Sequence, residues 1–216
     1  MTGSVVFKPL VRLARNMVVL RHAGELTLIN SVRLDPAGLA ALEALGRVAH
    51  VMRIGFHGMD DAFYLDRYGA KAWVVRGARR EGVGEDVAEL SEEAALPFPL
   101  ARVFLFKATV QLEAALLVER EGGLLITCDS VQHWEASPLM SPLAKLATLV
   151  LGFRKPAQIG PPWRKRQTPP GGSLRGDFER LASLPFVRLI GGHGGVLESR
   201  AQELLQATID RELGAG

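Results

Sequence analysis

The sequence predicts an α/β fold, a four-layer αββα sandwich in which mixed β-sheets lie between outer helices. Short apolar runs rich in Val, Ile and Leu recur along most of the 216 residues, with helix-like stretches between and after them. Some of these runs follow one another directly, which indicates hairpins and therefore antiparallel pairs. Because the order is mixed rather than strictly alternating, it favours the sandwich over an open doubly wound sheet.

Eight segments are expected to be strands, because short apolar runs bounded by glycine or charge are typical of buried strands. The first two meet across a short turn at Ala23 and Gly24, and three more follow consecutively within residues 102–129. The expected strands are residues 17–20, 26–32, 48–54, 72–75, 103–106, 114–118, 124–127 and 186–190.

Five segments are expected to be helices, at residues 36–45, 60–68, 139–151, 173–183 and 197–213. The first has the clearest start signal, because Asp35 is a favourable N-cap and Pro36 suits the first helical position. Residues 151–172 carry five prolines, four of them in adjacent pairs, and are expected to form an irregular basic loop. Such a loop is either a lid over a binding site or a passive insertion, and the sequence leaves both open.

The composition is that of a globular chain, with 48% hydrophobic and 23% charged residues, and we expect one domain over residues 1–216. The net charge of +3 comes without a sustained basic stripe, so no nucleic-acid partner is expected. No apolar segment approaches the length of a membrane span, and the N-terminus lacks the pattern of a signal peptide. With a single cysteine, Cys128, these features favour a cytoplasmic protein.

Three polar residues stand where expected strands end. His57 follows residues 48–54, Asp129 ends GGLLITCD, and His193 lies in LIGGHGG after residues 186–190. Each alone is an ordinary turn or cap residue. Their shared position at strand ends is one from which a common site can be built, and a metal there would need histidine and carboxylate ligands because the chain has one cysteine.

The order of these residues resembles that of the metallo-β-lactamase-fold hydrolases. That family presents a His-x-His-x-Asp-His motif after an early strand, a Gly-His motif, a strand ending in Gly-Asp, and a late Gly-His-Gly before a C-terminal helix. From about Leu26 onward this chain is similar: HGMDDA matches the first motif at His57 and Asp61, LLITCD ends in Asp129, and GGHGG carries His193. The resemblance implies the metallo-β-lactamase type of αββα sandwich.

The chain departs from the family pattern at four places. Met59 and Ala62 stand where histidines are expected, Cys128 replaces the glycine of Gly-Asp, and FKATVQLEAALL has no histidine where Gly-His should fall. The resemblance therefore implies an incomplete pair of metal sites.

Of the two metal sites in the family, the one with three histidines retains only His57 of them in this chain. The other site retains Asp61, Asp129 and His193. Three protein ligands suffice for a mononuclear site that water completes. Glu113, within the segment of the missing histidine, ranks ahead of His133 as a substitute ligand.

The resemblance implies a divalent metal, zinc, iron or manganese, and a hydrolase for an ester, thioester, lactone or phosphoester. Asp60 or Asp61 would orient the attacking water, although Asp60 also suits a helix N-terminus. The alternative is a metal-free, non-catalytic member in which His57, Asp61, Asp129 and His193 form a polar cluster and the basic loop recruits an anionic ligand or partner. The expected partner is a small-molecule substrate, either neutral or anionic; the oligomeric state is open.

Overall fold

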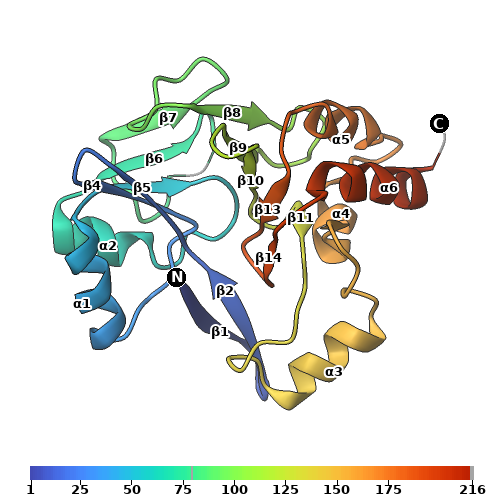
Figure 1. Cartoon of the computed structure of the whole chain (residues 1–216), viewed down its shortest axis with the longest axis horizontal. Coiled ribbons are helices and arrows are strands. Elements are labelled where there is room, and N and C mark those ends of the chain that lie inside the picture. Colours follow the sequence, from blue (N-terminus) through green and yellow to red (C-terminus); the bar gives the residue numbers. More distant parts are fainter. Residues whose placement is uncertain (79, 215–216) are drawn as a thin grey trace.

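The computed structural model describes residues 1–78 and 80–214, and its centre consists of two five-stranded sheets (Figure 1). The first sheet has the order β3-β4-β5-β6-β7. In it β3 runs antiparallel to β4, and the remaining neighbours are parallel. Its strands are β3 (Val18–His22), β4 (Glu25–Ile29), β5 (Arg47–Arg53), β6 (Lys71–Val75) and β7 (Val87–Leu90).

The second sheet has the order β14-β13-β10-β9-β8 and is mostly antiparallel. Only β10 and β13 pair in parallel, so their C-terminal ends lie at the same edge. The strands are β8 (Ala101–Leu105), β9 (Ala114–Val118), β10 (Leu124–Ile126), β13 (Arg188–Ile190) and β14 (Val196–Leu197).

Three hydrophobic clusters separate four layers. One packs α1 (Pro36–Leu45) and α2 (Asp61–Tyr68) on the first sheet, and another fills the space between the sheets. The third, which contains Trp163, Phe178 and Ile209, packs the second sheet against α4 (Pro161–Gln167), α5 (Arg175–Ala182) and α6 (Ala201–Leu213). The expected αββα sandwich with mixed sheets is confirmed.

Two small antiparallel pairs extend this sandwich. The hairpin of β1 (Thr2–Lys8) and β2 (Val11–Asn16) runs from the sheets toward α3 (Pro142–Val150) at one end of the molecule (Figure 1). The second pair joins β11 (Val131–Gln132) to β12 (Gln158–Ile159). The sequence did not predict the hairpin, because Lys8, Arg12 and Arg15 interrupt its apolar residues.

The expectation that residues 151–172 form a loop throughout is wrong. They contain β12 and α4, and Trp163 of α4 is buried in the core. The two prolines that argued against a helix occupy its first positions, where a missing backbone N–H costs nothing. Burial of the Trp163 ring stabilises the short helix.

The first expected helix has the predicted bounds, and the Gly38 N–H donates to the Asp35 carboxylate over 2.7 Å, which confirms the N-cap. The last expected helix begins later than predicted, at Ala201, because residues 196–197 pair with β13 as β14. Within the described ranges, no helix is long and apolar enough to span a bilayer.

Candidate metal centre

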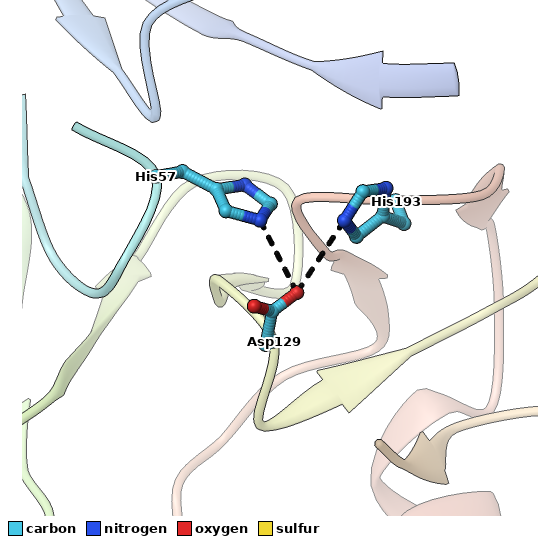
Figure 2. Close-up of side chains that lie close together, drawn as sticks. All are labelled: His57, Asp129 and His193. Atoms are coloured by element: carbon cyan, nitrogen blue, oxygen red, sulfur yellow. Dashed lines mark ion pairs between the residues drawn. The ribbon is translucent and has the colours of Figure 1, made fainter. Parts of the chain in front are cut away.

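Three loops that follow strands bring His57, Asp129 and His193 together (Figure 2). His57 follows β5 of the first sheet, whereas Asp129 and His193 follow β10 and β13 of the second. One ligand atom from each residue lies within 4.8 Å of the other two. The structure thus assembles three of the residues that the sequence singled out, from both sheets.

The Asp129 carboxylate faces both imidazoles. Its Oδ1 lies 3.3 Å from His57 Nε2 and 3.5 Å from His193 Nε2, as the dashed lines in Figure 2 show. The two rings are nearly perpendicular, with centroids 4.8 Å apart. Both Nε2 atoms therefore point at one carboxylate oxygen.

A backbone carbonyl determines the tautomer of His193. Its Nδ1 lies 2.7 Å from the Ala14 carbonyl oxygen, which can only accept a hydrogen bond, so Nδ1 carries the proton. Burial lowers the pKa of His193 to about 4, although the Asp129 charge acts in the opposite direction. The neutral ring therefore presents the Nε2 lone pair to Asp129.

Asp129 is ionised, in contrast to the neutral His193. Burial opposes its ionisation, but His57, His193 and Arg166 together hold the pKa of this carboxyl below its ordinary value. Gln132 Nε2 donates to Asp129 Oδ1 over 2.9 Å and fixes the carboxylate in place. The site thus contains an ionised carboxylate.

Glycines and an aromatic ring give the histidines their close packing. A Cβ on Gly192 would lie 2.7 Å from His57 Nδ1, and one on Gly194 would lie 2.1 Å from the His133 carbonyl oxygen. Gly194 also has a φ of 85°, which favours glycine. Trp134 stacks on the His193 ring with centroids 5.2 Å apart. The GGHGG segment is therefore a close-packed turn.

Asp60 and Asp61 lie outside this group and each pairs with an arginine. Asp61 is buried, accepts from Arg53 Nε over 2.7 Å, and accepts from the Ser31 hydroxyl. Asp60 pairs with the buried Arg15 over 2.8 Å. Both carboxylates hold the loop around His57 in the structure.

Glu113 is also outside the group. It is fully buried, and Trp163 Nε1 donates to its Oε2 over 2.7 Å, whereas its Oε1 has no hydrogen-bond partner among the described residues. Burial, with help from the Asp129 charge, raises the pKa of Glu113 to about 8. A Cβ on Gly55, two residues before His57, would lie 3.2 Å from Glu113 Cδ, so this acid underlies the His57 loop.

The sequence reasoning missed the residues that support the group. His133, the other substitute considered, pairs with Glu135 over 3.4 Å instead. The supporting residues are Gln132, Trp134 and the hairpin residue Asn16, whose side-chain amide donates to the carbonyls of Gly191 and Gly194. Neither spacing nor composition marks them, because their roles depend on tertiary contacts.

The donor set fits a divalent cation. Two imidazole nitrogens and one carboxylate oxygen are ligands that zinc and iron accept. His193 Nε2 and Asp129 Oδ1 are both acceptors in these states, so a cation between them satisfies two groups that otherwise repel. In addition, the buried His57 Nδ1 has no partner among the described residues.

Solved structures of the metallo-β-lactamase fold match nearly the whole chain. The metallo-β-lactamase of Erythrobacter litoralis is 11% identical, with a TM-score of 0.62 over 97% of this chain and 87% of that chain. The mono-zinc form of the metallo-β-lactamase FIM-1 from Pseudomonas aeruginosa is 13% identical, with a TM-score of 0.59 over 97% and 89%.

A third match is not described as a β-lactamase. The chemotaxis sensor ODP, solved with a peroxy diiron species, is 12% identical, with a TM-score of 0.61 over 94% of this chain and 88% of that chain. No family model matches the sequence, and no curated protein does. Identities this low establish a shared fold and leave function to the site.

Proposed function

Because the chain has the metallo-β-lactamase fold, we propose that it is a metal-dependent hydrolase with one metal ion held by His57, Asp129 and His193. The substrate is an ester, thioester, lactone or phosphoester. The observation that carries the proposal is the His193 Nε2 lone pair, fixed by Ala14, which faces the ionised Asp129 over 3.5 Å. A cation between a neutral imidazole and a carboxylate at this distance would satisfy both acceptors, and zinc, iron and manganese are the candidates.

A divalent ion in such a centre lowers the pKa of water and polarises a carbonyl or phosphoryl oxygen. The chain's own residues orient and position the metal ligands. Ala14 and Trp134 fix the His193 ring, and Gln132 fixes Asp129. Such outer contacts raise ligand basicity and hold the ligands in place. Asp61 is held by Arg53, which makes it a support of the His57 loop in this proposal.

A pocket of about 670 Å³ begins beside His57 and offers room for the non-reacting part of a substrate. Its lining includes both neighbours of His57 and several exposed apolar side chains, Phe56, Met59, Val110 and Leu112. Arg53 also lines it, but that guanidinium is occupied by Asp61 and two backbone carbonyls. The pocket therefore favours substrates with an apolar group next to the scissile bond.

The second candidate is a metal-free ligand-binding or interaction protein. The observation that favours it is the contact between His57 Nε2 and Asp129 over 3.3 Å, in which an N–H at Nε2 would donate to the carboxylate without a metal. Under this hypothesis the group is a hydrogen-bonded polar cluster. The apolar pocket would then bind a ligand without chemistry.

Elemental analysis of protein purified without added metal separates the two candidates. We expect close to one zinc, iron or manganese per chain, lost in His193→Ala and Asp129→Ala. His133→Ala is the matched control, because His133 lies near the group but pairs with Glu135. The control should keep its metal. A native protein that holds no metal and takes up none from excess zinc, iron or manganese excludes the hydrolase.

Activity is then measured on a panel of one ester, thioester, lactone and phosphoester. We expect hydrolysis of at least one, with rates that follow metal content across the three variants. Metal bound at full occupancy without hydrolysis of any class would leave metal binding intact and refute the hydrolase.

A further inference from the structure

The helix α3 exposes an apolar face. Its exposed leucines at positions 143, 146 and 149 repeat every three residues and therefore share one side of the helix. Together with Val150 and Leu151 they are 48–74% exposed. The opposite side, with Ala144 and Thr148, is buried. A helix that is apolar on both sides is normally enclosed by other elements, so this outer face is suited to a partner or an apolar phase.

The tip of the β1–β2 hairpin extends this face. Ser141 Oγ donates to the Leu10 carbonyl over 2.8 Å, and Arg12 Nε donates to the Leu139 carbonyl over 3.1 Å. Leu10 is 82% exposed. Figure 1 shows α3 and the hairpin tip together at one end of the molecule, away from the sheets. The apolar surface is thus built from two segments that hydrogen bonds join.

The basic residues are segregated along the chain in the same segments. Residues 1–24 and 136–176 contain 11 of the 26 Lys and Arg residues and none of the 23 Asp and Glu residues. The rest of the chain is therefore net acidic. Of these cations, Lys145 lies on α3, Arg12 and Arg154 contact backbone carbonyls of residues 139 and 145, and Lys155 follows Arg154 in the chain. Among the described residues none of these four forms an ion pair, whereas most other exposed cations do.

Backbone contacts hold some of these cations around the apolar face. Arg154 Nη2 donates to the Lys145 carbonyl over 3.0 Å, as Arg12 does to Leu139. Both guanidinium groups are thereby positioned without losing their charge. The α3 patch, defined as Leu10, Leu143, Leu146, Leu149, Val150 and Leu151 with Arg12, Lys145, Arg154 and Lys155, thus combines an apolar centre with a basic border.

We propose that the α3 patch docks the protein onto the surface of an anionic phospholipid bilayer. The leucines enter the boundary between headgroups and acyl chains, and the four cations contact lipid phosphates. This is the arrangement of interfacial helices, which lie in the membrane plane and bind through apolar area and basic charge together. The exposed face of α3 contains none of the proposed metal ligands, although the buried face packs with Ala14 and Trp134, which contact His193. The proposal does not depend on the hydrolase.

Two other occupants fit the patch less well. A second copy in a symmetric dimer would bring the same unpaired cations against one another. A nucleic acid would be expected to use exposed aromatic rings for stacking, but the exposed side chains here are Leu and Val, and Phe153 packs on Trp134. Charge and side-chain type together therefore favour lipid.

Sedimentation with vesicles of phosphatidylcholine, with and without an equal part of phosphatidylglycerol, tests the proposal on the full chain. We expect binding to the mixed vesicles only, weakened when salt rises from about 0.1 M to about 1 M. Lys145→Gln/Lys155→Gln should reduce the affinity roughly 25-fold, since a basic residue at such a surface contributes about fivefold. Leu146→Ser/Leu149→Ser should reduce it at least roughly tenfold, through lost apolar burial.

Matched controls remove the same groups from other faces. Leu45→Ser/Leu100→Ser removes two exposed leucines, and Arg47→Gln/Lys71→Gln removes two exposed cations. Both should bind like the native protein, and circular dichroism checks that all four variants fold. Absence of binding to mixed vesicles, or equal loss in patch and control variants, overturns the proposal. So does a dimer that Leu146→Ser/Leu149→Ser dissociates, or RNA binding without vesicle binding.

Discussion

Asp61 and Asp129 both lie near His57, but the surroundings of their carboxylates are opposite. Asp61 is buried against the Arg53 guanidinium and the Ser31 hydroxyl, so its charge is paired within the protein. Asp129 faces two imidazoles and receives one hydrogen bond from Gln132. A buried charge is tolerated only when it is paired and hydrogen-bonded. We therefore propose that Asp61 is part of the scaffold and that Asp129 has capacity left for a cation.

This difference shows that a residue can match a family motif without lying in the functional site. In the sequence, Asp61 occupies the Asp position of HGMDDA and Asp129 that of the strand ending in Gly-Asp, so both are expected as ligands. In the structure, Arg53 of β5 donates a hydrogen bond to the Asp61 carboxylate. Variants at Arg53, Asp61, Glu113 and Gln132 test this assignment of roles.

The largest expected effect is that of removing the partner of Asp61. Arg53→Met keeps most of the side-chain volume but leaves a buried carboxylate with one hydroxyl donor. We expect a loss of about 3–5 kcal/mol in the free energy of unfolding, measured by urea denaturation. The double variant Arg53→Met/Asp61→Asn should recover most of it, because the uncompensated charge is gone.

The same variants report on the metal. If Asp61 is scaffold, Asp61→Asn keeps the metal of the native protein, whereas Asp129→Asn loses it. If Asp61→Asn folds normally but loses the metal, Asp61 is a metal ligand and its scaffold role is contradicted.

A third buried carboxyl group, that of Glu113, has no arginine or histidine partner among the described residues, and it remains protonated instead. Its pKa of about 8 lies above the ordinary value of 4.5, so the folded state holds a proton that the unfolded state loses. Stability from this group is present below about pH 4.5 and is lost as the pH rises through 8. Glu113→Gln cannot ionise and keeps an oxygen for the Trp163 N–H.

We therefore expect metal-free Glu113→Gln to gain stability relative to the native protein between pH 5 and pH 9. The gain should reach a few kcal/mol, at about 1.4 kcal/mol per pKa unit. Urea denaturation at several pH values measures it, and other titrating groups cancel in the difference. A constant difference across this range would show that Glu113 ionises normally.

The sequence predicted the parts of this molecule that local patterns encode. Apolar runs indicated β5, β10 and β13. The residues that follow these strands, His57, Asp129 and His193, lie together in the structure. The αββα layers followed from the mixed order of elements. These succeeded because strand ends position side chains whatever the remaining sequence contains.

The rest depended on contacts between distant segments. The β1–β2 hairpin has too many charges to be recognised as strands, yet Ala14 fixes the His193 tautomer and Asn16 holds the glycine turn. Helix α4 begins with two prolines and is stabilised by burial of Trp163. The partner of Asp61 could not be read from spacing, because Arg53 is one of 26 basic residues.

The smallest expected effect concerns the hydrogen bond that distinguishes Asp129 from Asp61. Gln132 donates to Asp129 Oδ1, the oxygen that both histidines face, and its own Oε1 accepts from Trp134. Gln132→Leu removes both contacts and frees the carboxylate to rotate away from His57 and His193. Competition with a chromophoric chelator should give a metal affinity about tenfold weaker, at unchanged stoichiometry, with His133→Ala as the control. An affinity that rises instead would mean that the Gln132 amide competes with the metal for Oδ1, so that Asp129, like Asp61, is already satisfied by the protein.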